Sequence, residues 1–199
     1  MSEGQHTGTT DDGAGRTTLV ARGGDALLDR AAMNGGDCPV TPESGVVWVT
    51  TDGADDVIDQ VRGAGVMPAS VDVVSLGESV RSATAGANDP CSTSVPFRPT
   101  DLTVHAVGDS ARLDDVGTTI VDCLEAIDAA GRDAVLVVED LDALLDASGP
   151  EATFRFLHVL VGRVGASDGS AVVGYDPDAT AVDVASTFAV LFDELRQAQ

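Results

Sequence analysis

Residues 134–145 read AVLVVEDLDALL: five apolar residues, then Glu139 and Asp140, then a second apolar segment. An apolar run without alternation is typical of a central strand in a parallel sheet, because helices cover both of its faces. In such sheets ligands bind beyond the carboxyl ends of the strands, which is where Glu139 and Asp140 fall. The stretch therefore predicts a parallel α/β sheet and makes the two acids candidate metal ligands.

The segments around this stretch alternate between strand-like and helix-like patterns. Residues 113–130 carry one apolar stripe at helical spacing and end at Gly131, a typical C-cap. The run Ser148-Gly-Pro-Glu151 has capping-box spacing with a proline in the first turn, and it predicts a helix that reaches about Val164. This alternation predicts a three-layer α/β/α fold with a mostly parallel central sheet. Further strands are expected at residues 17–21, 45–50, 71–76, 102–107 and 171–175, and further helices at 26–33, 54–64 and from Asp178 or Thr180 to about Arg196.

The chain of 199 residues has the length of one domain. Residues 1–16 lack an apolar segment, and we interpret them as a disordered acidic tail. Residues 17–196 form the predicted single domain. Within it, residues 82–100 are rich in Ser, Thr, Asn, Gly and Pro, and they predict a flexible surface loop.

The charge balance is extreme. The sequence has no lysine, its 11 basic residues are all arginine, and 33 acidic residues give a formal net charge of −22. Like charges at this density destabilise a compact state at low salt, whereas at 1 M salt a Debye length of about 3 Å screens them. The composition is typical of a cytoplasmic protein of a halophile that accumulates salt. It disfavours nucleic acid and anionic membranes as partners, since both require clustered basic residues.

Three cysteines, Cys38, Cys91 and Cys123, form no C-x-x-C pair and leave an odd number. This pattern suits a reducing cytosol, and we expect all three to be core or loop residues. His105 and His158 have no His or Cys partner at metal-ligand spacing, so each is interpreted as a hydrogen-bonded or surface residue.

A nucleotide site would need a phosphate loop after the first strand. Such a loop uses several glycines, a lysine for the phosphates and a Ser or Thr for magnesium. Arg22, Gly23 and Gly24 are the only candidates for phosphate contacts there, and Asp25 places a negative charge where the anion would lie. The apolar strand that ends in Glu139 and Asp140 is nevertheless typical of a Walker-B segment, in which an acid holds magnesium.

Three stretches carry a resemblance to a known family: VVEDLDALL (137–145), PEATFRFLHVLVGRV (150–164) and VVGYDPDA (172–179). Together they resemble RecA/KaiC-like ATPase domains, and more closely a family of haloarchaeal proteins of unknown function that are degenerate members of that group. The resemblance implies a topology like that of P-loop NTPases with a degenerate Walker A, and it gives Asp140 the position of the Walker-B acid. Arg22 could in principle replace one of the missing charges, but its planar guanidinium is not equivalent to a lysine.

These observations predict a non-catalytic regulatory or protein-interaction module that is not an enzyme and has no cofactor. The partner is another protein or a second copy of the chain. The alternative is a weak Mg-nucleotide binder without standard ATP hydrolysis, which would use Arg22, Gly23 and Gly24 for the nucleotide and Glu139 and Asp140 for the metal. A phosphate-receiver domain is disfavoured, because it needs a lysine near its last strand and an arrangement of acids that Asp101 and Asp109 do not match.

Overall fold

The computed structural model describes residues 15–22, 39–63, 65, 67–76, 101–107 and 112–196. These residues form seven strands and five helices in largely alternating order. The strands are β1 (Thr17–Ala21), β2 (Gly45–Thr50), β3 (Ser70–Leu76), β4 (Leu102–Val107), β5 (Ala134–Val138), β6 (Ser170–Tyr175) and β7 (Glu194–Arg196), and the helices are α2 (Ala54–Gly63), α4 (Leu113–Ala129), α5 (Leu141–Ser148), α6 (Pro150–Ala166) and α7 (Val182–Ala189).

All seven strands belong to one sheet with the order β4-β3-β2-β5-β6-β1-β7. Each neighbouring pair is parallel, and β5, the strand of the AVLVV run, lies at the centre between β2 and β6. All five residues of β5 are buried, as expected of a strand covered on both faces. The predicted parallel α/β architecture is confirmed.

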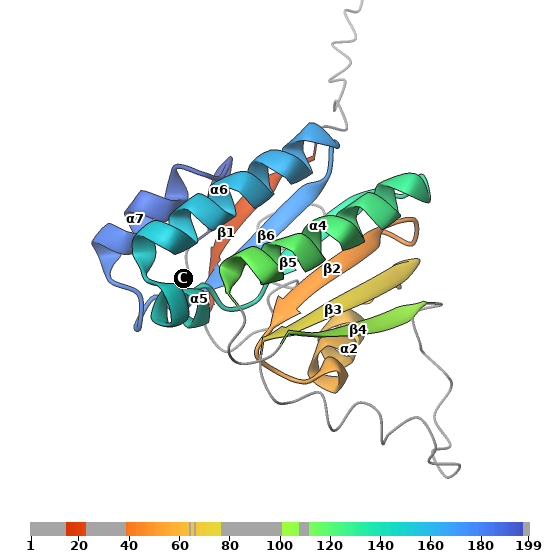
Figure 1. The fold of residues 1–199 in the computed structure, drawn as a ribbon, viewed down its shortest axis with the longest axis horizontal. Coiled ribbons are helices and arrows are strands. Elements are labelled where there is room, and N and C mark those ends of the chain that lie inside the picture. Colours follow the sequence, from red (N-terminus) through yellow and green to blue (C-terminus); the bar gives the residue numbers. More distant parts are fainter. Residues whose placement is uncertain are drawn as a thin grey trace, which may run out of the picture.

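Two separate apolar clusters cover the two faces of the sheet. On one face, α2 packs against alternate residues of the central strands, including Trp48, Val135 and Val137. On the other face, α4, α5, α6 and α7 pack against the residues between them, including Val47, Leu136 and Val138. Figure 1 shows α4 and α6 in front of the sheet and α2 behind it. The sheet is therefore the middle of three layers.

The helix predicted to start at a Ser148–Glu151 capping box begins differently. Ser148 is the last residue of α5, a short helix that the sequence interpretation did not separate, and Gly149 forms the junction with a φ of 76°. Glycine adopts this left-handed backbone at little cost, and Pro150 then starts α6, where its missing N–H is not needed. The predicted capping box is wrong, whereas the predicted proline in the first turn of the helix is confirmed.

The C-terminal segment also departs from the prediction. The helix expected to run from Asp178 or Thr180 to about Arg196 is limited to α7, with Ala181 as its N-cap, and the chain then adds a seventh strand, β7. Apolar residues such as Phe192 extend the helical pattern beyond Ala189. The free edge of β1 offers competing backbone hydrogen bonds, however, and it pairs with residues 194–196.

Several predictions fall outside the described residues: most of the acidic tail at 1–16, the loop at 82–100, Gly23, Gly24 and the helix at 26–33, Cys38 and Cys91. Within the described part of the chain, no helix is long and apolar enough to cross a membrane.

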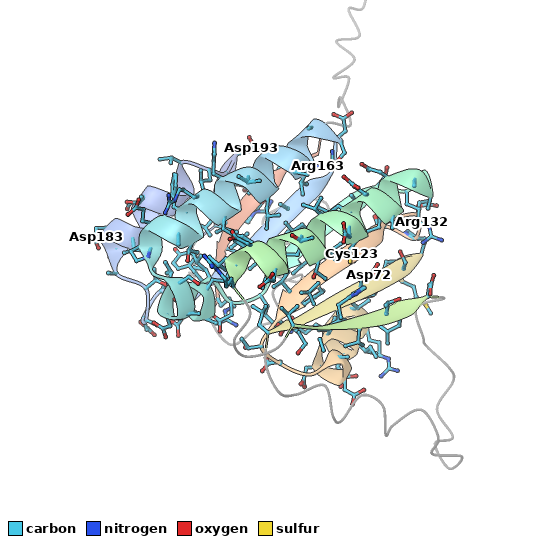
Figure 2. The ribbon with its side chains drawn as sticks, in the orientation of Figure 1. Asp72, Cys123, Arg132, Arg163, Asp183 and Asp193 are labelled. Carbon is cyan, nitrogen blue, oxygen red and sulfur yellow. The ribbon has the colours of Figure 1, made fainter. Side chains whose placement is uncertain are left out.

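Asp193 attaches the start of β7 to the start of β1. Its carboxylate accepts hydrogen bonds from the backbone N–H of Thr17 at 2.9 Å and from the Thr17 hydroxyl at 2.7 Å. Figure 2 labels Asp193 at this end of the sheet. The two hydrogen bonds from Thr17, first through its side chain and then through its backbone, hold the pKa of Asp193 below its usual 3.8.

We predict that Asp193→Asn lowers the free energy of unfolding by about 1 kcal/mol at neutral pH, because a charged acceptor is lost at a largely exposed position. The folded-state pKa is depressed, so this stabilisation is present above the unfolded-state pKa and disappears as the pH falls through the folded-state value. Chemical denaturation in molar KCl at pH 7 and near pH 3 measures both effects. Asp146→Asn removes the same charge from an exposed site on α5 and is the control. A difference between Asp193→Asn and wild type that persists unchanged at pH 3 would contradict the assignment.

Candidate functional site

The chain changes direction in the sheet between β2 and β5. From β2 it continues through α2 to β3 on one side, whereas from β5 it continues through α5 and α6 to β6 on the other side. The two connections cover opposite faces, so the carboxyl ends of β2 and β5 form a topological switch point. This is the place where open parallel sheets bind ligands.

Glu139 follows β5 at this point and is 6% exposed. Its backbone N–H bonds to the carbonyl of Val49, which extends the pairing of β5 with β2 by one residue. The carboxylate accepts hydrogen bonds from the Trp48 indole at 3.2 Å, from the Thr50 hydroxyl at 2.5 Å and from the Gln60 side-chain amide. Trp48 and Thr50 belong to β2 and Gln60 belongs to α2, so one buried carboxylate connects three elements.

Asp140 also contacts the protein's own donors. It is the N-cap of α5 and accepts a hydrogen bond from the backbone N–H of Ala143 at 3.1 Å. An Arg22 side-chain nitrogen lies 3.4 Å from the same Asp140 carboxylate, with both side chains about one quarter to one third exposed. Arg22 follows β1 and is held by its backbone N–H to the carbonyl of Tyr175. Its Nε is buried and has no hydrogen-bond partner among the residues that the structure describes.

Negative charge is concentrated around these residues. Burial raises the pKa of Asp52, and the carboxylates of Glu139, Asp56 and Asp140 raise it further, while Arg22 lowers it. Asp52 lies two residues after Thr50, the carboxyl end of β2. The edge of the sheet therefore holds four acids and one arginine, and a cation would relieve their repulsion.

A further acid at the same edge also serves the fold. Asp142, in the first turn of α5, accepts hydrogen bonds from the backbone N–H of Asp176 at 2.8 Å and from the Thr180 hydroxyl. It thereby attaches α5 to the segment that follows β6. At this edge Glu139, Asp140 and Asp142 therefore accept hydrogen bonds from protein donors.

The structure brings three of the predicted site residues together: Arg22, Glu139 and Asp140 all lie at the carboxyl edge. Their roles in binding nucleotide or metal stay predictions. Sequence interpretation missed Asp52 and the three donors to Glu139. The polar run Thr50-Thr51-Asp52 after a buried strand was a usable signal, but the sequence does not say that β2 lies beside β5.

The two candidate histidines differ in their surroundings. His158 is exposed on α6 and stacks on Phe154, with ring centroids 6.4 Å apart. His105 is half-buried and lies 3.0 Å from a carboxylate oxygen of Asp72. Both agree with the prediction of surface or hydrogen-bonded residues.

A family of unknown function, DUF7504, matches residues 7–195, so the chain belongs to this family. No curated protein matches the sequence. Among solved structures, the KaiC-like protein PH0186 from the hyperthermophilic archaeon Pyrococcus horikoshii OT3 is similar, with 13% sequence identity and a TM-score of 0.44. That match covers 88% of this chain and 68% of the other.

We predict that Glu139→Gln lowers the free energy of unfolding by about 1–3 kcal/mol, because an amide group would face donors that now meet a carboxylate oxygen. Fluorescence of Trp48, the only tryptophan, follows unfolding and reports the loss of its indole hydrogen bond directly. Glu125→Gln makes the same change at an exposed position on α4 and should cost about 0.5 kcal/mol or less. A Glu139→Gln protein more stable than wild type would mean that repulsion among the neighbouring acids outweighs the three hydrogen bonds.

Proposed function

We propose that this member of the DUF7504 family is a non-catalytic RecA/KaiC-like domain that works by binding another protein. The observation that carries the proposal is the use of Glu139: its buried carboxylate already accepts three hydrogen bonds from Trp48, Thr50 and Gln60. A magnesium ion at Glu139 would have to displace donors that stabilise the fold. The donor set at this carboxylate therefore does not fit a magnesium site.

The environment of Arg22 supports the same conclusion. A phosphate loop presents a lysine and a hydroxyl to the nucleotide. Here the chain has no lysine, and the one described cation after β1, Arg22, lies beside Asp140. Nucleotide phosphates at this edge would lie near Asp52 and Asp140. The negative charges of these two carboxylates would repel the phosphates.

A groove between α4 and α6, with a volume of about 1000 Å³, supports a role in protein binding. Its lining includes the apolar side chains of Val121, Phe156 and Val159, and Arg112 and Arg155 also line it. Val159 is 65% exposed, so its apolar side chain is accessible to a partner in the groove. We take a second copy of the chain as the first partner to test.

We predict that the protein in molar KCl shows a concentration-dependent mass by sedimentation and no shift of its melting temperature with Mg-ATP. Val159→Asp should weaken association about tenfold or more, because it places a charge in the apolar groove. Val182→Asp makes the same change at an 81% exposed site on α7, outside the groove, and should associate as wild type does. A single mass at all concentrations would contradict self-association.

The second candidate function is weak Mg-nucleotide binding, and the cluster of acids around Asp52 favours it. Burial and three neighbouring carboxylates raise the pKa of Asp52, so a divalent cation would lower the local energy. Asp140 would share the ion, and Arg22 would turn from Asp140 to the phosphates. A melting shift with Mg-ATP that Asp140→Ala abolishes would support this function over the first.

We also propose that the protein works in the cytoplasm at molar salt. The net charge of −22 supports this, because repulsion at that density is screened only at high ionic strength.

In dilute buffer we predict loss of the near-ultraviolet circular dichroism of Trp48 and cooperative recovery on addition of KCl. NaCl at equal ionic strength should restore the signal equally, since screening does not depend on the identity of the ion. A native spectrum without salt would contradict the halophilic interpretation.

A further inference from the structure

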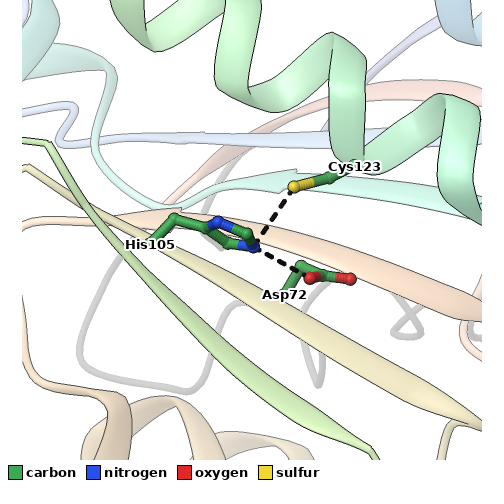
Figure 3. A group of neighbouring side chains, drawn as sticks. All are labelled: Asp72, His105 and Cys123. Atoms are coloured by element: carbon green, nitrogen blue, oxygen red, sulfur yellow. Dashed lines mark hydrogen bonds and ion pairs between the residues drawn. The ribbon is translucent and has the colours of Figure 1, made fainter.

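Asp72, His105 and Cys123 converge on the opposite face of the sheet from Glu139. Asp72 comes from β3, His105 from the neighbouring strand β4 and Cys123 from α4, which packs over both strands. Figure 3 shows the imidazole of His105 between the other two side chains, with both dashed contacts ending on the same ring nitrogen. His105 Nε2 lies 3.0 Å from Asp72 Oδ1 and 3.4 Å from Cys123 Sγ.

One ring nitrogen cannot form both contacts as two separate two-centre hydrogen bonds. If Nε2 carries a proton, it donates that proton to Asp72. The nitrogen then has no free lone pair to accept the S–H proton of Cys123. If Nε2 is unprotonated, it accepts from the thiol, and its lone pair then faces a carboxylate oxygen of Asp72. A cation placed among the three donor atoms satisfies all of them at once.

The arrangement does not fit a Cys-His-Asp nucleophile. In such triads the nucleophile and the orienting carboxylate contact different nitrogens of the histidine. Here both contacts are at Nε2. Burial, with smaller contributions from the charges of Asp72 and Asp122, also raises the pKa of the Cys123 thiol to about 11, so the free thiol is protonated at neutral pH.

The spacing of the donor atoms fits a tetrahedral metal site. With metal–ligand distances of about 2.0–2.3 Å, neighbouring ligand atoms of a tetrahedral zinc ion lie about 3.2–3.7 Å apart. The observed 3.4 Å lies within this range and the observed 3.0 Å lies just below it, and all three donor atoms lie within 4.8 Å of one another. Among the described residues, this is the one group of three such side chains that meets that distance.

We propose that Asp72, His105 and Cys123 bind one zinc ion, with a water molecule at the fourth position. A thiolate, an imidazole and a carboxylate are the ligand types that zinc takes, whereas magnesium and calcium prefer oxygen alone. Binding replaces the thiol proton of Cys123, which is released to solvent, so the thiolate and the carboxylate together balance the charge of the ion. The side chain of His105 is 32% exposed, which leaves a path for the water ligand.

This site stands apart from the proposed function. Glu139 and Asp72 lie on opposite faces of the sheet, one toward α2 and the other toward α4. The two sites share no residue.

Cobalt(II) tests the site directly, because it reports both geometry and ligand type. The full chain, stripped of metal with a chelator and dialysed into molar KCl, is titrated with cobalt and then with zinc. We expect one cobalt per chain, visible bands of tetrahedral cobalt and a sulfur-to-cobalt charge-transfer band, all lost when one zinc displaces the ion. Magnesium at the same concentration should displace nothing.

Variants identify the ligands. Cys123→Ala should abolish the charge-transfer band. His105→Gln should weaken zinc binding about 100-fold or more, which is a larger loss than the removal of a residue that only hydrogen-bonds to a ligand would cause. A double variant, Cys38→Ser with Cys91→Ser, and the histidine control His158→Gln should both bind as wild type does. If the fluorescence of Trp48 shows that Cys123→Ala does not fold, the zinc affinity of His105→Gln is the test of the site. A folded wild-type chain without the cobalt bands, or bands that survive His105→Gln, would overturn the proposal.

Discussion

The buried carboxylate of Glu139 is the contact on which the carboxyl edge of the sheet depends. A carboxylate that is 6% exposed is costly unless donors surround it, and here donors arrive from β2 and from α2. The hydrogen bond from Gln60 holds α2 against the end of β5, and those from Trp48 and Thr50 hold the end of β2. Because β2 and β5 form the switch point of the sheet, the place where such folds bind ligands is occupied by internal hydrogen bonds. This constraint is the physical basis of the proposal that the domain acts through its surface.

Acidic side chains other than Glu139 also stabilise the fold by accepting hydrogen bonds. The chain carries three acidic residues for each basic one, and its acids are placed where they accept hydrogen bonds: Asp140 and Asp142 at the start of α5 and Asp193 at the start of β7. Arg22 is one of the few cations, and it lies beside Asp140. Molar salt would let a fold built in this way tolerate a high net negative charge, because salt would screen the exposed acids while Glu139, Asp140, Asp142 and Asp193 already accept hydrogen bonds from the protein.

Local patterns were sufficient to predict much of the fold. The unbroken apolar run of β5, the stripe of α4 and Pro150 at the start of α6 each follow from a single local rule, and the structure agrees with them. The errors arose where distant segments compete for the same backbone: β7 forms because β1 leaves an edge free, which a helical pattern in residues 182–192 does not reveal. The grouping of Asp72, His105 and Cys123 was missed for a related reason. These residues are 33 and 18 positions apart, far from any metal-ligand spacing, and only the β3-β4 pairing under α4 brings them together.

The most direct measurement is the nuclear magnetic resonance signal of the single indole N–H, that of Trp48, in molar KCl with and without Mg-ATP. If Glu139 is held as an internal acceptor, the indole proton exchanges slowly with water and its resonance does not move when Mg-ATP is added. Fast exchange, or a resonance that shifts on addition of Mg-ATP, would show that the carboxylate is available to a ligand. That result would contradict the account of a closed edge.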